Sequence, residues 1–281
     1  MAEEFNLYQD IAGRTGGSIY IGCVGPVRTG KSTFIKNFME LMILPGITDP
    51  NERSRAVDEL PQSSNGRTIM TTEPKFIPNE GVAVEFHGPG GEAVHFKAKM
   101  IDCVGYMVPG AIGHMEENEN RMVKTPWFEE EIPFVQAAEI GTRKVIAEHS
   151  TVGLVVTTDG SVTDIPREDY KQAEERVIGE LKKLGKPFIV LLNSANSNRD
   201  TVRILAEHLS EEYEVQVLPI NAKEMTREDA DRVLMALLEE FPARELALFF
   251  PSWVETLDLD HSIKQSMIKM LRGCAEKVSR M

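Results

Sequence analysis

One short stretch constrains this chain more than any other, because GPVRTGKS at Gly25–Ser32 matches the pattern G-x-x-x-x-G-K-[S/T]. A β-branched run, Ser18–Val24, precedes it directly, and a helical pattern over Ser32–Ile43 follows. Glycines let backbone N–H groups wrap around a phosphate, and the helix N-terminus adds its positive dipole. In such a loop Lys31 reaches the β- and γ-phosphates and Ser32 offers a hydroxyl to Mg²⁺. The sequence therefore predicts a nucleotide-binding domain.

Strand-like and helical stretches alternate along the chain around this motif. Short β-branched runs between helical segments indicate parallel strands that are buried on both faces. The predicted parallel strands are Ser18–Val24, Thr151–Thr157, Pro187–Leu192 and Val215–Ile220, and three added strands are Glu73–Ile77, Val82–His87 and Ala93–Ile101, with a hairpin turn at His87–Gly91. The predicted helices are Ser32–Ile43, Phe134–Glu148, Arg167–Leu184, Asp200–Leu209 and Arg227–Glu240. This pattern predicts an α/β P-loop NTPase with a doubly wound, mostly parallel sheet and helices on both faces.

The last forty residues differ in character from the rest. We expect an NTPase domain over residues 1–241 and a helical extension over residues 242–281, which we interpret as the start of a further domain. From Ile263 onward, apolar residues recur at helical spacing between the basic residues Lys264, Lys269, Arg272, Lys277 and Arg280. A basic amphipathic helix can lie on an anionic membrane, pack on an acidic domain or lead into another domain. Because its apolar stripe lacks Trp and Phe, we favour packing or a linker.

Composition narrows the cellular setting. The 281 residues carry a formal net charge of −13, which disfavours sequence-independent nucleic-acid binding because phosphate backbones repel such a surface. The three cysteines are scattered and lack metal-like spacing, which is typical of buried thiols in a reducing compartment. The N-terminal stretch is acidic where a signal peptide needs a basic region. We therefore expect a cytoplasmic protein.

A second motif, MIDCVG at Met100–Gly105, closes the third added strand. A carboxylate at the carboxyl end of a strand beside the phosphate loop can hold Mg²⁺ directly or through water, and Asp102 is the candidate. Gly105 lets its backbone N–H approach a γ-phosphate. The D-x-x-G pattern alone is weak, since many strands end in Asp before a turn. Its place after the phosphate loop supports the metal interpretation.

Between the two motifs lies NGRTIMTTEPKF, Asn65–Phe76, a stretch of low periodicity. A Thr in this stretch can complete the Mg²⁺ shell and sense the γ-phosphate. Thr71 and Thr72 are both candidates, and the sequence does not separate them. The alternative is that these threonines only begin a β-strand, for which Thr has good propensity.

The end of the Pro187–Leu192 strand bears on the choice of base. It continues into NSAN, Asn193–Asn196, where a GTPase carries N-K-x-D. The Lys that would pack on the base is missing, as is the carboxylate that would accept the guanine N1–H and N2–H₂ donors. This departure favours ATP or a loose choice of base, and leaves Asn193 a scaffolding role. The later NAK, Asn221–Lys223, is a weak signal for a loop that closes over the base.

Two residues bear on hydrolysis. Tyr106 follows D-x-x-G where fast GTPases often place a water-orienting Gln, so we expect slow intrinsic turnover. Arg28 is unusual inside a phosphate loop, and can swing over the phosphates as a finger in cis, pair with an acid or simply be solvated.

The catalytic candidates are Lys31, Asp102, Thr71, Thr72 and Arg28, and the metal-binding candidates are Ser32, Asp102, Thr71 and Thr72. The nucleotide-binding candidates are Gly25, Arg28, Thr29, Gly30, Lys31, Ser32, Thr33, Gly105 and Asn193.

The segment Gly105–Pro133, which follows Asp102, contains several acidic residues and the aromatic pair Trp127 and Phe128. If exposed, these rings can form a contact between subunits. The alternative is that they pin a long loop to the domain.

The order of six segments resembles the ATPase region of the stage IV sporulation protein A family, spore-coat morphogenetic proteins of endospore-forming bacteria. The segments are GPVRTGKS, TIMTTEPKF, MIDCVGY, TPWFEEEIPF, AAEIGTRKVIAEHST and VTTDGS. The resemblance covers nearly the whole chain. It implies a translation-factor-like GTPase fold that uses ATP, with Lys31 and Ser32 on phosphate and Mg²⁺, Asp102 on Mg²⁺, and Thr71 and Thr72 as sensor threonines. Members of the family continue well beyond the length of this chain.

The resemblance also implies a function. We expect Mg²⁺-dependent ATP hydrolysis that drives self-assembly into the basement layer of the spore coat, on the mother-cell side of the outer forespore membrane. The expected partners are further copies of the protein and other coat morphogenetic proteins, with membrane recruitment through a region outside this chain. A nucleotide-binding switch with negligible hydrolysis and an architectural assembly protein are the alternatives.

Overall fold

A computed structural model of the chain describes residues 18–61, 74–87, 93–111, 115–116, 119–241 and 252–275. The chain divides into two compact units, Met1–Leu237 and Leu238–Met281. Among the described residues, no helix is both long enough and apolar enough to cross a membrane.

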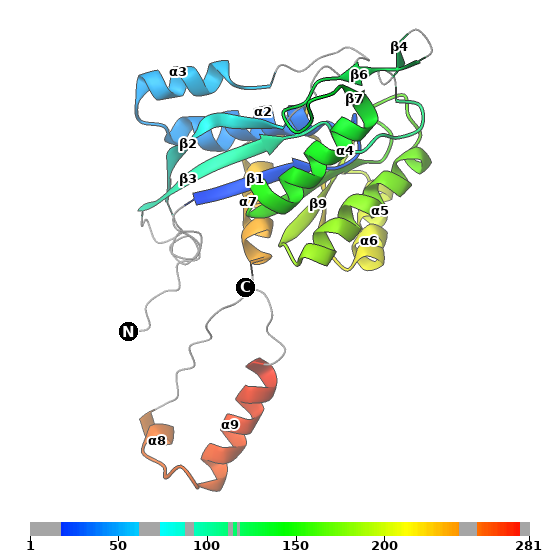
Figure 1. Cartoon of the computed structure of the whole chain (residues 1–281). Coiled ribbons are helices and arrows are strands. Elements are labelled where there is room, and N and C mark those ends of the chain that lie inside the picture. The colour runs from blue at the N-terminus through cyan, green and yellow to red at the C-terminus, as the bar shows by residue number, and fades with distance from the viewer. Residues whose placement is uncertain are drawn as a thin grey trace. The chain divides into compact units, whose positions relative to one another are not determined.

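The first unit is built on a six-stranded sheet of order β10-β9-β8-β1-β3-β2 (Figure 1). Its neighbours pair in parallel except β2, which runs antiparallel to β3 at the edge. The strands are β1 Ser18–Val24, β2 Lys75–His87, β3 Ala93–Asp102, β8 Val152–Thr158, β9 Phe188–Asn193 and β10 Val217–Ile220. The predicted α/β fold with a mostly parallel sheet is confirmed.

Helices cover both faces of this sheet (Figure 1). On one face, Arg176 joins α5 to Glu139 of α4, and Lys171 joins α5 to Glu212 of α6. On the other, Arg227 at the start of α7 donates to the carbonyl of Leu41, just beyond α2. The helices are α2 Lys31–Phe38, α4 Phe134–Lys144, α5 Arg167–Leu184, α6 Asp200–Tyr213 and α7 Arg227–Glu239. Because the central strands are covered twice, every residue of β8 and β9 is buried, as their continuous apolar runs predict.

The structure differs from several of the predicted elements. The two edge strands predicted before Val94 form one strand, β2, whose register shifts between Ile77 and Val82, and the predicted turn after His87 falls outside the described residues. Two long predicted helices change to π-helical turns, η1 Met39–Ile43 after α2 and η3 Val145–His149 after α4. The antiparallel pairing of β2 with β3 agrees with the predicted hairpin.

One helix, α3 Pro50–Asp58, was not predicted. Its start carries recognisable signals, because the Asp49 carboxylate accepts hydrogen bonds from two backbone N–H groups and Pro50 occupies the first turn. Within the helix only Ala56 is buried. Its sequence therefore lacks the apolar periodicity by which the other helices are predicted. A 3₁₀ turn, η2 Leu44–Gly46, lies just before it.

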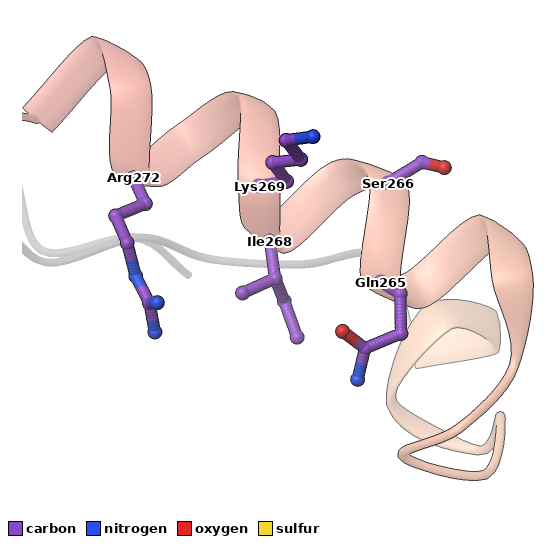
Figure 2. Close-up of a pocket in the computed structure, with 5 residues that line it drawn as sticks. All are labelled: Gln265, Ser266, Ile268, Lys269 and Arg272. Atoms are coloured by element: carbon purple, nitrogen blue, oxygen red, sulfur yellow. The ribbon is translucent and has the colours of Figure 1, made fainter.

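Two pairs of short strands lie in the first unit outside the main sheet, and the second unit is helical where the structure describes it. Two small antiparallel pairs follow Asp102 in the chain, β4 Met115–Glu116 with β5 Glu119–Asn120, and β6 Met122–Val123 with β7 Ile132–Pro133. The second unit contains α8 Ser252–Glu255 and α9 Ser262–Ala275. A hollow of about 470 Å³ lies beside α9, lined by Gln265, Ser266, Ile268, Lys269 and Arg272 (Figure 2). None of these residues belongs to the predicted nucleotide site.

Candidate nucleotide site

The phosphate loop joins β1 to α2 through backbone conformations that favour glycine. Gly25 has φ +136° and Gly30 has φ +92°. A Cβ on Gly25 would lie 2.4 Å from the carbonyl oxygen of Val156, and one on Gly30 would lie 2.4 Å from the side-chain nitrogen of Asn193. Both predicted glycines are therefore required by the turn and by its close neighbours.

Lys31 is the first residue of α2 and is buried, with 5% of its surface exposed. Its ammonium donates to the carbonyl of Pro26 at 2.6 Å, and the hydroxyl of Thr29 donates to the same oxygen at 3.1 Å. These bonds hold the side chains over their own loop. An ammonium carries three N–H donors, so Lys31 retains the capacity to bind phosphate oxygens.

Ser32 and Asp102 meet although they lie seventy residues apart. Parallel pairing of β1 with β3 sets Asp102 opposite Cys23 in register, next to the phosphate loop. The hydroxyl of Ser32 donates to one carboxylate oxygen of Asp102 at 2.6 Å. The other oxygen, Oδ1, is buried and has no hydrogen-bond partner among the described residues. A hydroxyl beside a buried, half-satisfied carboxylate is an oxygen donor set that suits Mg²⁺.

The Asp102 carboxylate has an unfavourable environment for its charge. Burial raises its pKa above the ordinary value, and the Ser32 hydroxyl and the Lys31 ammonium only partly oppose this effect. A buried carboxylate with an unused oxygen is costly unless a cation balances it. The residues present therefore fit a divalent cation.

Gly105 lies against the phosphate loop. Its φ is +96°, and a Cβ there would lie 2.2 Å from the carbonyl oxygen of Gly25 and 2.7 Å from the amine of Lys31. Its backbone N–H donates to the hydroxyl of Thr142 on α4 at 3.2 Å. Sequence reasoning missed Thr142, because a fully buried Thr on the inner face of an amphipathic helix carries no distinguishing signal. The next residue, Tyr106, exchanges backbone hydrogen bonds with Gly25 and Val27.

Tyr106, in the place of a water-orienting Gln, directs its side chain to other groups. The ring is buried, the hydroxyl donates to Glu180 of α5, and the guanidinium of Arg176 lies 4.3 Å from the ring centre. Burial, the Glu180 hydrogen bond and the Glu180 charge raise the pKa of Tyr106 far above its usual range. The hydroxyl is thus a neutral donor that ties the loop to α5. Slow turnover stays a prediction.

Arg28 has φ +63°, in the left-handed region that non-glycine residues rarely adopt. It is half-buried. Burial raises the pKa of Tyr170 on α5, and the positive charge of Arg28 is among the groups that oppose this shift. Arg28 therefore lies near the start of α5. Both interpretations of this residue, a finger or a paired cation, remain predictions.

Asn193, the last residue of β9, links two loops. It is 4% exposed, and its side-chain N–H donates to the carbonyl of Thr29 at 2.9 Å. Its side-chain oxygen accepts from the backbone N–H of Ala222, after β10, at 3.0 Å. The loop after β9 is thereby joined to the phosphate loop on one side and to the NAK segment on the other.

The remaining candidates divide into three cases. Thr71 and Thr72 lie outside the described residues. Thr33 is half-buried on α2, where its side chain makes no hydrogen bond with any residue that the structure describes. Trp127 packs near α4, since its ring lies 3.4 Å from the position of a Cβ on Gly141, whereas Phe128 is exposed.

Comparison with known proteins identifies this arrangement. Residues 2–242 match the family model described as stage IV sporulation protein A, ATPase domain. The chain belongs to the stage IV sporulation protein A family. It is 50% identical over 279 residues to stage IV sporulation protein A of Bacillus anthracis and, equally, to that of Bacillus subtilis (strain 168), in each case covering 99% of this chain and 56% of the relative.

A third member of the family, stage IV sporulation protein A of Clostridioides difficile (strain 630), is 51% identical over 267 residues. That match covers 95% of this chain and 54% of the relative. The chain thus spans little more than half the length of these relatives. The resemblance drawn from the sequence motifs is confirmed, and the family's ATPase domain accounts for residues 2–242.

Proposed function

We propose that this chain hydrolyses ATP in a Mg²⁺-dependent reaction and that hydrolysis drives self-assembly of the protein into the basement layer of the spore coat. The observation that carries the proposal is the contact of Ser32 with Asp102, 2.6 Å apart beside the buried ammonium of Lys31. A hydroxyl, a carboxylate and an ammonium at a glycine-rich loop are the groups that a Mg²⁺-nucleotide needs. The family description supports ATP as the substrate.

Each residue has a distinct role in this proposal. Lys31 and the backbone N–H groups of the phosphate loop bind and orient the triphosphate. Ser32 and Asp102 hold Mg²⁺, and Thr71 and Thr72 are the sensors that complete its shell. Bound Mg²⁺ supplies positive charge that neutralises the phosphates during transfer.

Two further groups act on the γ-phosphate in this proposal. Gly105 presents its N–H there, after exchanging its bond to Thr142. Arg28 is the candidate to stabilise charge as the phosphate leaves.

The proposed location and partners follow from the relatives. We place the protein on the mother-cell side of the outer forespore membrane, in the cytoplasm, in contact with further copies of itself and with other coat morphogenetic proteins. The relatives' name supports a role in sporulation. Recruitment to the membrane surface through a region outside this chain is part of the same proposal. No nucleic acid is proposed as a partner, given the net charge of −13.

A second function is favoured by one observation. Tyr106 is engaged with Glu180, which leaves the position after D-x-x-G without a group to orient water. A nucleotide-binding switch or an architectural assembly protein with negligible hydrolysis would show this same feature. These alternatives differ from the first proposal in whether phosphate release accompanies assembly.

The test measures phosphate release and light scattering together. Wild-type protein with Mg²⁺ is given ATP, GTP or a non-hydrolysable ATP analogue. We expect phosphate release and increased light scattering with ATP, and either none or much slower release and scattering with GTP. Lys31→Ala should abolish both signals. Lys36→Ala removes a partly exposed lysine from the same helix and serves as the matched control. Scattering with the analogue as strong as with ATP would instead support the architectural function.

A further inference from the structure

A side chain of helix α4 holds the backbone N–H of Gly105. Gly105 is buried, and its N–H donates to the hydroxyl of Thr142 at 3.2 Å. That hydroxyl donates its own proton to the carbonyl of Ala138, one helical turn earlier, at 2.8 Å, and the Sγ of Cys103 lies farther away, at 3.6 Å. A hydroxyl has one proton and two lone pairs, so the oxygen of Thr142 faces Gly105 as an acceptor.

The helix that carries this acceptor is closely packed. The buried face of α4 consists of Phe134, Ala137, Ala138, Gly141 and Thr142. A Cβ on Gly141 would lie 3.4 Å from the ring of Trp127 and 3.5 Å from the ring of Pro74. Thr142 is itself fully buried. Its hydroxyl is therefore an acceptor in a fixed position.

The donor, in contrast, lies beside the predicted phosphate site. A Cβ on Gly105 would lie 2.7 Å from the amine of Lys31, which binds the β- and γ-phosphates in the proposed function. The next residue, Tyr106, is bonded through its backbone to Gly25 and Val27 of the phosphate loop. Because a glycine tolerates a wide range of φ, the N–H of Gly105 can turn from α4 toward a phosphate while Tyr106 keeps these bonds.

We propose that the Thr142 hydroxyl competes with the γ-phosphate for the N–H of Gly105, and that Thr142 thereby sets how strongly the site prefers ATP to ADP. This inference rests on the proposed ATPase function. ADP has no γ-phosphate, so the N–H stays on Thr142 when ADP is bound. ATP must break the bond to Thr142 before the N–H can donate to its γ-phosphate, and this loss reduces the advantage of ATP over ADP. Thr142 acts through Gly105 and is thus a positioning residue.

The experiment removes the acceptor and measures the binding of two nucleotides. Thr142→Val and Thr142→Ala both delete the hydroxyl, whereas Thr142→Ser keeps it. Thr125→Val is the matched control, because Thr125 is also buried and its hydroxyl makes no hydrogen bond with any described residue. Binding of ADP and of a non-hydrolysable ATP analogue is measured with Mg²⁺ by calorimetry.

We expect the ratio of analogue affinity to ADP affinity to rise in Thr142→Val and Thr142→Ala by about fivefold or more. In these variants the buried N–H of Gly105 has no partner until a γ-phosphate arrives, and an unsatisfied buried donor is disfavoured by at least about that factor. Thr142→Ser and Thr125→Val should keep the wild-type ratio to within about twofold. A general loss of packing weakens both nucleotides together and leaves the ratio unchanged, so the ratio separates competition from a purely structural role.

The outcomes distinguish this inference from the proposed function. Wild-type protein that binds neither nucleotide would overturn the proposed function, and with it the inference. Nucleotide binding by the wild type, together with an unchanged or lower ratio in Thr142→Val and Thr142→Ala, would overturn the inference and leave the function standing. A ratio that rises equally in Thr142→Ser would also overturn it, because that variant retains the competing hydroxyl.

Discussion

The hydrogen bonds of Asn193 give the most direct test of how this site is held together. The variant Asn193→Ala removes two bonds, at 2.9 and 3.0 Å, to the carbonyl of Thr29 and the N–H of Ala222. Both partner residues are fully buried, so each backbone group is left unsatisfied at a cost of about 1–3 kcal/mol. We expect the free energy of unfolding to fall by roughly 2–6 kcal/mol in total. For a domain of this size each kcal/mol lowers the melting temperature by about 2–4 °C, so the melting temperature should drop by roughly 4–24 °C.

The assay is urea unfolding followed by circular dichroism, with Asn198→Ala as the matched control. Asn198 is exposed on the same loop, so that variant should stay within about 0.5 kcal/mol of wild type. Tripolyphosphate affinity is measured in parallel. It should weaken for Asn193→Ala, because the side chain that holds the phosphate loop through the Thr29 carbonyl is then missing. A loss of stability below about 1 kcal/mol would refute the reasoning, because two unsatisfied buried groups cannot cost so little.

Two further predictions concern other sites. Gly105→Ala places a Cβ 2.2 Å from the Gly25 carbonyl oxygen at a φ of +96°, so it should lower the free energy of unfolding by at least about 2 kcal/mol. The control Gly179→Ala lies in helix α5 with open space around it and should raise the free energy of unfolding by about 0.5–1 kcal/mol. Equal effects of the two variants in thermal melts would contradict the argument. At the start of α7, burial acts to raise the pKa of Asp229, but hydrogen bonds from the backbone and hydroxyl of Thr226 outweigh it and lower the pKa. Wild type should therefore melt above Asp229→Asn at pH 7, and that gap should close as the pH falls below about 4, where the carboxyl protonates; a gap that widens in acid would show the opposite sign.

The parts of the fold that depend on chain-wide pattern were predictable. The continuous apolar runs of β8 and β9 and the full length of α5 follow from periodicity alone, since burial on two faces or on one stripe leaves a regular trace in the sequence. The helix α3 leaves no such trace, because only Ala56 is buried in it. Its capping residue Asp49 and the following Pro50 were the available signals.

Contacts between distant polar groups were harder to predict. The meeting of Ser32 with Asp102 follows from two motifs of known order, since parallel strands bring their carboxyl ends to one edge. The bond from Gly105 to Thr142 follows no such rule, because it depends on the packing of α4 against that edge. Sequence patterns locate the ends of strands, whereas the helix residue that faces each end is decided by side-chain packing.

The segment Asn193–Asn196 shows how one short motif divides into two physical tasks. Asn193 is buried, and its side chain bonds to two backbone groups of neighbouring loops, so it has a structural role that depends on the fold. Asn196 is exposed and its side chain has no hydrogen-bond partner among the described residues, so no contact of the fold in that part of the chain depends on its carboxamide. The departure from N-K-x-D thus leaves the architecture of this loop intact, because the bonds that join it to the phosphate loop and to the segment after β10 come from Asn193, which the departure retains.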